Sequence, residues 1–598
     1  MKLEKVDYLV ALCLLVTLAI NYGLTSTLKQ IPSPVYGGDF YNGLGGVVHI
    51  TDGGNPLESA QMVGELPWVP PLYHITIAIL SKISGLNEMN ALINFALLVQ
   101  FASFIVVFFL LFEITQNKYS ALIGTLLFVP LHAPIFKYSD FATVLMVPLF
   151  LLGLIRFTKN PDQKNMIFCS LTLGLLSLSN TQAFFVGFLV LGITFLFWIL
   201  PKILKDKTLN TNLESNDIES LKRYAIVFVI AFLIALTFWY KPLFVYYGET
   251  PNEVQDFTRP DVREPAIFWK MFGNFVSWLL FPYNNGPIMV FSLLSLYGLY
   301  QVAKNRKENT FIIIVLVSWF IAMAHPVVTL PLINKHLVME MMAERLQVIS
   351  VMLIAFGTSQ IPKLIKNKDL VVVLFLALIL VSVLNYSDYF EKQKQEHWVV
   401  NAGQQELAPH FAELQKWVRE NTNVNDVFIT TNENGFMLNA LSGRKMVSYR
   451  RAHASPYTDM NQRMMDQAII LYGENEQKTK ELLQKYNVKY LLWSPDWLFL
   501  EYYFDSNGQL VGFNDPLSVP DTLKYELQLK ENNVNYVKRN GYFDPAPPSD
   551  APRYDMIVTL PKNLDVEKPY SQQFLDNFKL IKTIQYNGND AFRIYEVK

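Results

Sequence analysis

Long apolar segments alternate with short polar connections over the first two thirds of the chain. Segments with few charges recur at the length needed to cross a bilayer, at 8–28, 91–112, 120–136, 142–156, 167–180, 183–201, 223–243, 287–303, 310–330, 345–362 and 370–386. Two more apolar stretches, 71–86 and 267–282, are opened by prolines or interrupted by polar residues, so we expect them to be interfacial or re-entrant. The pattern predicts a polytopic α-helical membrane domain with about eleven transmembrane helices.

The pattern changes after residue 387 to a charged, turn-rich segment that is long enough for one domain. Short β-rich runs alternate there with helical runs, which is typical of an α/β domain with a parallel sheet; the expected strands are 426–431, 445–449, 488–493, 557–560 and 592–596, and the expected helices are 435–441 and 478–486. The stretch 503–556 is rich in Asn, Asp and Pro and predicts long loops or an insertion. We therefore expect two domains, a transmembrane domain at 1–386 and an α/β domain at 387–598.

Basic residues in the short connections predict the orientation in the membrane. They gather in 156–164, 202–223, 304–307 and 363–368, which the positive-inside rule assigns to the cytoplasm. Residues 31–90, 137–141, 244–286, 331–344 and everything after 387 then face the other side. The sequence thus predicts a multi-pass protein of the cell membrane whose C-terminal domain is extracytoplasmic.

Composition agrees with this class and excludes others. Hydrophobic residues make up 51% of the 598 residues and charged residues only 17%, which is too apolar for one soluble core. A net charge of −1, without a basic tract interleaved with aromatics, gives no sign of nucleic-acid binding. Both cysteines, Cys13 and Cys169, lie in apolar segments, so neither a disulfide framework nor a cysteine zinc site is available.

Two acidic residues are candidates for catalysis. Asp39 follows a glycine pair just beyond the first span, where a carboxylate near lipid is costly and indicates function, although glycines and Asp also build ordinary turns. Asp140 lies between the third and fourth segments and is expected on the same side, where it is equally suited to cap the following helix. Two such acids can divide proton transfer and the stabilisation of a leaving phosphate, either directly or through a metal.

A third group lies in the loop before the tenth segment. His336, Glu340 and Glu344 recur near helical spacing and would form a polar stripe on a helix. Arg345 follows at the membrane boundary, where its planar guanidinium suits a phosphate. The alternative is an interfacial helix with a solvated face, in which Glu344 balances Arg345.

The order of these features resembles the GT-C superfamily of integral-membrane glycosyltransferases, in particular the branch of the oligosaccharyltransferase catalytic subunit. The resemblance covers nearly the whole chain and is carried by one span, Gly37-Gly38-Asp39, Pro70-Pro71-Leu72-Tyr73-His74, Asp140, Arg345 and a final α/β domain. It implies that Asp39 and Asp140 are catalytic, around a divalent cation such as Mg²⁺ or Mn²⁺ if the enzyme is metal-dependent. It also implies that Arg345 meets a lipid-linked phosphate.

The chain departs from that branch in two places. The Trp-Trp-Asp-Tyr-Gly signature that reads the acceptor sequon is replaced by Thr430-Thr431-Asn432-Glu433-Asn434-Gly435. The second outer loop carries one acid where that branch often has two, which leaves metal dependence open. Transfer to asparagine is therefore not the first expectation.

We expect a membrane glycosyltransferase that moves a sugar from a polyprenyl-phosphate-linked donor to a glycan, lipid or protein acceptor on the extracytoplasmic face. Asp39 would be the general base of an inverting displacement, and Arg345 and Lys137 would meet the donor phosphate, whose tail lies among membrane lipids. The expected substrate contacts are Tyr41, Asn42, His74, His336, Glu340 and Glu344. The alternatives are an oligosaccharyltransferase-like enzyme, and an inactive GT-C-like scaffold or transporter for surface glycan assembly.

Overall fold

The chain divides into two compact units. The computed structural model describes residues 4–31, 38–128, 137–199, 215–252, 265–284, 286–333, 347–396, 398–507, 510–540, 555–565, 567–571 and 576–598. We call Met1–Leu28, Ile93–Leu243 and Val262–Asn401 the membrane unit, and Lys29–Leu92, Phe244–Asp261 and Ala402–Lys598 the α/β unit. The predicted boundary near 387 divides the chain differently, because the contacts group the first polar segment with the C-terminal part.

Helices form the membrane unit, and each of the eleven predicted segments contains one. Seven helical stretches are long and apolar enough to cross a membrane: Lys5–Thr25 (α1), Glu88–Thr115 (α4), Tyr138–Lys159, Leu221–Val245, Gly286–Lys304, Thr310–Thr329 and Lys368–Glu396 (α20). The helices described in the other predicted segments are shorter, namely α5 (Lys118–Phe128), α8 (Gln163–Ser177), α9 (Thr181–Thr194) and α18 (Gln347–Ser359). The predicted polytopic helical fold is confirmed.

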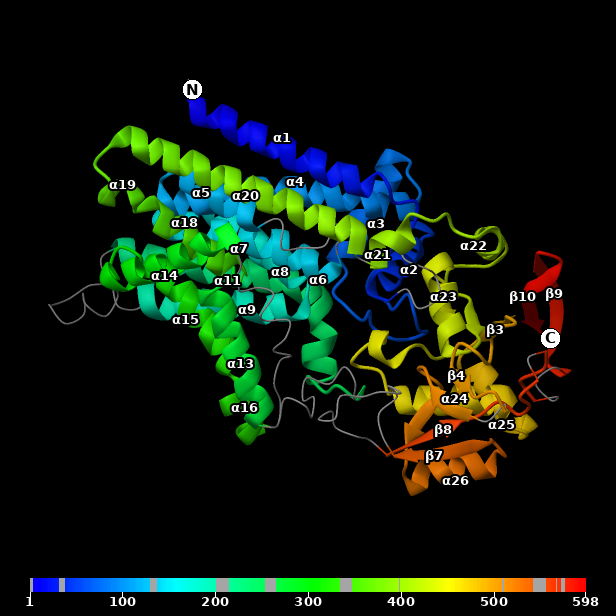
Figure 1. The fold of residues 1–598 in the computed structure, drawn as a ribbon. Coiled ribbons are helices and arrows are strands. Elements are labelled where there is room, and N and C mark those ends of the chain that lie inside the picture. The colour runs from blue at the N-terminus through cyan, green and yellow to red at the C-terminus, as the bar shows by residue number, and fades with distance from the viewer. Residues whose placement is uncertain are drawn as a thin grey trace. The chain divides into compact units, whose positions relative to one another are not determined.

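Glycines let helices of this unit approach closely. A Cβ on Gly298 of α14 (Met289–Lys304) would lie 2.1 Å from the Leu353 carbonyl oxygen of α18, and one on Gly357 would lie 2.1 Å from that of Leu294. Small residues at helix crossings are the usual device for tight packing where lipid removes the hydrophobic drive. Helices α1 and α20 also run side by side (Figure 1), joined by a hydrogen bond from Asn21 to the Tyr386 hydroxyl.

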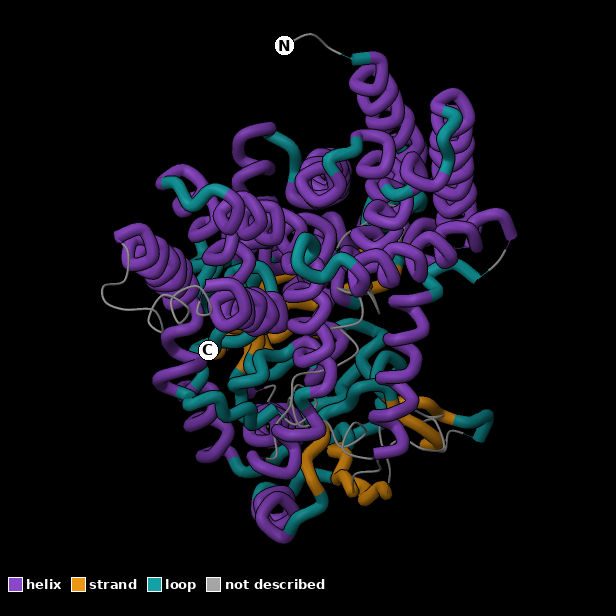
Figure 2. Tube along the Cα trace, turned by 90° about the vertical axis from the view of Figure 1, so that its left-hand side faces the viewer, coloured by secondary structure: helices purple, strands orange, loops and turns teal. Residues whose placement is uncertain are grey.

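A five-stranded sheet in the order β2-β1-β3-β10-β9 is the centre of the α/β unit (strands are orange in Figure 2). Its parallel part consists of β2 (Lys445–Met446), β1 (Val427–Ile429) and β3 (Val488–Trp493). Helix α23 (Asn432–Ser442) connects β1 to β2, while α24 (Met460–Tyr472) and α25 (Glu476–Lys485) lead from β2 to β3. The predicted α/β fold is thus present, extended by the antiparallel strands β10 (Asn589–Val597) and β9 (Phe578–Tyr586).

The stretch 503–556 is an insertion with its own strands, so the alternative expectation of long loops is wrong for its described part. It contains β4 (Tyr502–Phe504), β5 (Leu510–Phe513), β6 (Ser518–Pro520), α26 (Leu523–Glu531), β7 (Tyr536–Asn540) and the start of β8 (Asp555–Thr559). Tyr502, Phe513 and Val558 form a small apolar core there. The stretch thus consists of short strands separated by turns, and this core holds the strands together.

An ion network joins the first polar segment to the C-terminal part. Arg419 donates to Asp52 Oδ1 at 2.5 Å and to both carboxylate oxygens of Glu88 at 2.9 and 3.0 Å. Arg444 is 2% exposed and donates to Asp52 Oδ2 at 2.5 Å. Removing one partner of such a buried group would leave an uncompensated charge, so the network holds the two segments together.

Helix α2 (Asp39–Thr51) packs directly on α23 because glycines remove side chains at the contact. A Cβ on Gly45 would lie 2.5 Å from Asn439 Oδ1, and one on Gly443 would lie 2.5 Å from the His49 backbone nitrogen. Gly443 also has φ +66°, the left-handed conformation that ends α23 and favours glycine. His49 Nδ1–H donates to the Gly443 carbonyl at 2.9 Å, which fixes the register of the two helices.

We expect Gly45→Ala to destabilise the protein by about 1–3 kcal/mol, because the new methyl group would overpack this contact. The measurement is the thermal unfolding midpoint of the full chain in detergent. Gly43→Ala in the same helix is the matched control, since its Cβ would meet Tyr73 at an ordinary 3.6 Å. Equal midpoints for the two variants would contradict the close packing of α2 on α23.

Candidate functional site

A carboxylate–imidazole pair lies at the start of α2. Asp39 is the first residue of the helix and follows Gly38, whose φ of +68° favours glycine. His453 ends the short 3-10 helix η8 (Arg451–His453), and its Nε2 lies 3.0 Å from Asp39 Oδ1. Both residues belong to the α/β unit, although 414 positions separate them in the sequence.

Aromatic rings hold the His453 imidazole. The Trp68 and Phe436 rings meet it edge-on, with centroids at 5.3 and 5.2 Å. Its Nδ1 is buried and has no hydrogen-bond partner among the described residues. The proton therefore belongs on Nε2, from which it is donated to the Asp39 carboxylate.

The two side chains differ in exposure. Asp39 is 28% exposed, whereas His453 is 14% exposed and its second nitrogen is buried. A general base must come within hydrogen-bonding reach of the proton that it removes. Asp39 can meet a substrate in this way, and His453 orients it.

A buried ion pair supports the aromatic wall behind His453. The Arg450 guanidinium stacks 3.6 Å from the centroid of the Phe436 ring and donates from Nε to Glu433 Oε1 at 2.5 Å. Its Nη2 also pairs with Glu433 Oε2. This two-pronged pairing satisfies both charges and fixes the position of Phe436 against His453.

Two further acids lie around that pair and favour their neutral forms. Burial raises the pKa of Glu501 well above its usual range, and the nearby Glu433 charge adds to the effect. The same two causes raise the pKa of Asp515 to about 7, against the opposing charges of Arg450 and Arg451. The ion pair of this cluster is therefore the one between Glu433 and Arg450.

Tyr41 and Asn42, which were predicted to contact substrate, take part in the packing of α2. Tyr41 is fully buried and its hydroxyl donates to Gln30 Oε1 at 3.3 Å. Asn42 Oδ1 accepts from Gln61 Nε2 at 2.9 Å and from the Tyr449 hydroxyl at 3.2 Å. These bonds hold α2 in place, and contact with a substrate stays a prediction.

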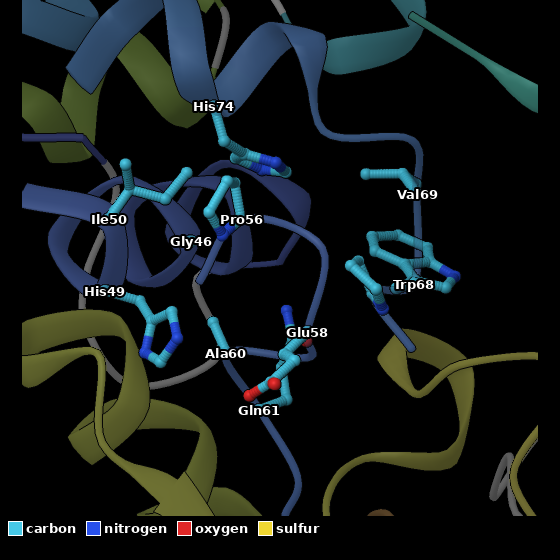
Figure 3. A pocket seen from close by; sticks show the side chains of 11 residues that line it. Gly46, His49, Ile50, Pro56, Glu58, Ala60, Gln61, Trp68, Val69 and His74 are labelled. Carbon is cyan, nitrogen blue, oxygen red and sulfur yellow. The ribbon is translucent and has the colours of Figure 1, made fainter. Parts of the chain in front are cut away.

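His74, on α3 (Leu72–Ser84), lines a small cavity beside α2 (Figure 3). The cavity has a volume of about 20 Å³, which is space for about one water molecule. Gly46 approaches the His74 ring so closely that a Cβ would lie 2.9 Å from it. His74 therefore packs against α2 here, and its predicted contact with substrate stays untested.

Asp140 and Lys137 belong to the membrane unit. The Lys137 backbone N–H donates to Asp140 Oδ2 at 3.2 Å, so the carboxylate closes the first turn of α6 (Tyr138–Phe141). The N-cap expected at Asp140 is Lys137 instead, and Asp140 is the third residue of α6, from which it completes a capping box. A catalytic role for either residue stays a prediction. The other predicted residues of the site, His336, Glu340, Glu344 and Arg345, lie outside the described residues.

The described residues do not supply enough ligands for a metal ion. Within the described ranges, no group of three or more His, Cys, Asp or Glu side chains could hold a metal ion. Asp39 and Asp140 belong to different units. We therefore assign no step of the chemistry to a cation, and binding of Mg²⁺ or Mn²⁺ stays a prediction.

Sequence reasoning missed His453 and the Glu433–Arg450 pair. The available signal was the basic run Arg450-Arg451-Ala452-His453, which begins four residues after β2 ends. Charged residues that leave a parallel strand at its carboxyl end gather at a common edge, where α/β proteins place their sites.

The fold is that of a known class of membrane protein. ArnT from Cupriavidus metallidurans, solved bound to undecaprenyl phosphate, matches with a TM-score of 0.50 and 11% identity, over 94% of this chain and 99% of that chain. The oligosaccharyltransferase AglB from Archaeoglobus fulgidus, in complex with an inhibitory peptide and a dolichol-phosphate, matches with a TM-score of 0.47 and 14% identity, over 85% and 74%. The first match confirms the predicted GT-C-like membrane fold with its α/β part.

The sequence comparison identifies a family to which the chain belongs. The chain is 36% identical over 108 residues to the uncharacterized protein MJ1080 of Methanocaldococcus jannaschii, a match that covers 18% of this chain and 80% of that protein. The chain belongs to the family of that protein. No family model matches it.

The raised carboxyl pKa of Asp515 predicts a pH-dependent stability. Its folded form holds a proton up to about pH 7, whereas an unfolded Asp releases it near pH 4, so its stabilising contribution is lost as pH rises across this window. Asp515→Asn should reduce the fall in unfolding midpoint between pH 5 and 8, and Asn tolerates the left-handed backbone at this position (φ +48°). Replacement of the exposed Asp565 by Asn is the control; equal pH profiles for the two variants would refute the assignment.

Proposed function

We propose that this protein is a membrane glycosyltransferase that moves a sugar from a polyprenyl-phosphate-linked donor to an acceptor hydroxyl. The observation that carries the proposal is the partly exposed Asp39 carboxylate, oriented by His453 at the start of α2. The fold supports it, because ArnT shares that fold and was solved bound to undecaprenyl phosphate, a polyprenyl phosphate.

Asp39 is the general base of a single displacement. Its carboxylate takes the proton of the acceptor hydroxyl while the acceptor oxygen attacks the anomeric carbon of the donor. The bond between that carbon and the phosphate oxygen breaks, and polyprenyl phosphate leaves with the bonding electrons. Because one displacement occurs, the anomeric configuration inverts.

The donor phosphate needs cationic partners at the membrane. In the proposal these are Lys137, on the membrane unit, and Arg345, whose guanidinium suits two phosphate oxygens. Asp140 lies three residues from Lys137 and orders its backbone. The isoprenoid tail lies among the apolar helices, and the α/β unit faces the extracytoplasmic side.

His453 is a positioning residue that keeps the carboxylate aimed at the acceptor. A displacement of a reacting group by about 1 Å can cost about 10²-fold in rate. The edge-on contacts with Trp68 and Phe436 restrict the imidazole and, through it, Asp39.

Asp39→Asn should abolish transfer, with a loss of at least about 10²–10⁴-fold in kcat, because an amide cannot accept the proton. The assay offers short-chain polyprenyl-phosphate sugars to purified protein and measures the release of polyprenyl phosphate. Asp565→Asn, at an exposed position of the same unit, is the matched control.

Wild-type activity in Asp39→Asn would refute Asp39 as the base. No release by the wild-type protein with any donor would instead favour an inactive scaffold or a transporter.

His453→Phe should lower kcat by about 10²-fold while KM for the donor changes little, because the ring still packs against Trp68 and Phe436 but no longer donates to the carboxylate, which loses its orientation. A rise in KM with unchanged kcat would contradict a positioning role.

A further inference from the structure

A pocket of the α/β unit lies apart from Asp39, at the carboxyl ends of the parallel strands. Its volume is about 380 Å³, within the range of about 300–1,000 Å³ typical of small-molecule sites. Its lining includes residues of four helices and strands and of the segment after β3: Asn434 of α23, Asp496 after β3, Tyr586 of β9, Phe592 of β10, and His410 and Phe411 of α22 (Pro409–Asn421).

The strand order explains why a pocket lies here. The chain runs from β1 to β2 on one side and later returns to β3 on the other, giving the order β2-β1-β3. Connections that diverge from neighbouring parallel strands leave a crevice at their carboxyl ends, where α/β folds bind ligands. Asn434 and Asp496 each follow one of these two strands.

A buried amide points to a polar ligand. Asn434 is 1% exposed, and its Oδ1 accepts a hydrogen bond from the Ser494 hydroxyl at 3.0 Å. Its Nδ2 is buried without a hydrogen-bond partner in the described part of the chain. Whichever way the amide is turned, one of its polar atoms stays unpaired, which is unfavourable unless a ligand supplies the partner.

Aromatic rings supply the apolar part of the lining. The His410 ring lies 4.3 Å from that of Tyr586 and 5.7 Å from that of Phe592, measured between centroids. The Tyr586 side chain is 41% exposed, so its ring remains accessible to a ligand. Such rings pack against the C–H groups of a ligand that also carries hydrogen-bonding groups.

The charge of the lining excludes an anionic ligand. Neither lysine nor arginine lines the pocket, whereas Asp496 and Asp590 do. Asp590 accepts from Arg593 Nε at 2.7 Å, so its charge is balanced, and the exposed Asp496 can accept from hydroxyl groups. Burial also lowers the pKa of His410, which favours the neutral imidazole as a hydrogen-bonding group.

We propose that this pocket binds a neutral saccharide. The aromatic rings cover its C–H groups, Asn434 donates to one of its oxygens, and Asp496 accepts from its hydroxyls. Helix α23 carries both sites, because Asn434 and Met437 line the pocket while Phe436 contacts His453. Assigning the saccharide to the acceptor glycan rests on the proposed transfer function; its binding does not.

The test measures binding without any lipid donor. Purified full-length protein in detergent is mixed with the methyl glycosides of glucose, galactose, mannose and N-acetylglucosamine, and saturation-transfer NMR reports contact with each ring proton. We expect binding of at least one glycoside, with the strongest transfer to the C–H protons of one face.

Variants locate the binding in this pocket. Tyr586→Ala and Asp496→Asn should each weaken it at least tenfold, whereas Tyr503→Ala, which removes a 40% exposed tyrosine outside the pocket, should leave it unchanged. Asp39→Asn should also bind normally, which separates this test from that of transfer.

Two results would overturn the proposal: the absence of binding by all four glycosides, and equal binding by wild type and both pocket variants. If Tyr586→Ala fails to fold, Asp496→Asn is the deciding variant, because the Asp496 side chain is exposed and its replacement does not disturb the core.

Discussion

The close contact between α2 and α23 is the constraint on which the candidate site depends. Gly45 and Gly443 let the two helices approach at the distance of backbone atoms, and His49 fixes their register through the Gly443 carbonyl. Helix α2 begins with Asp39, while α23 carries Phe436, which touches His453. A change in this contact would therefore move the carboxylate relative to the imidazole that orients it.

Charged side chains around the contact between α2 and α23 are held in ion pairs, which favours this arrangement of the two helices. Arg419 and Arg444 hold Asp52, at the end of α2, so both ends of this helix are tied to the C-terminal part of the α/β unit. On the other side of α23, Glu433 is paired with Arg450, while the neighbouring Glu501 favours its neutral form. The buried Glu433 carboxylate is thus paired, whereas the Asp39 carboxylate is partly exposed.

The sequence predicted the features that depend on local pattern. Hydrophobic segments predicted the membrane helices, and the β-rich run 488–493 predicted β3 with its exact ends. Long-range pairing is not encoded in such patterns. Asp39 could be singled out by its glycine-rich setting, but its partner His453 lies 414 residues away, and no local pattern pairs the two.

Because local patterns do not encode long-range pairing, the other differences between the predicted and the observed structure have the same cause. The grouping of 29–92 with the C-terminal part depends on ion pairs such as Arg419 with Asp52, which join residues 367 positions apart. The pocket at the sheet edge depends on strand order, since Asn434 and Tyr586 meet there only because β1, β3, β10 and β9 are neighbours. Strand 578–586 was missed because its buried positions, Phe578 and Ile584, do not recur at every second residue, so no alternating pattern marks it.

The stereochemistry of transfer tests the central claim most directly. A polyprenyl-phosphate sugar of defined anomeric configuration is offered to the purified protein with an acceptor alcohol, and the configuration of the product is determined by NMR. A single displacement with Asp39 as base predicts complete inversion at the anomeric carbon. Retention would require a second displacement through a covalent intermediate and would contradict the account.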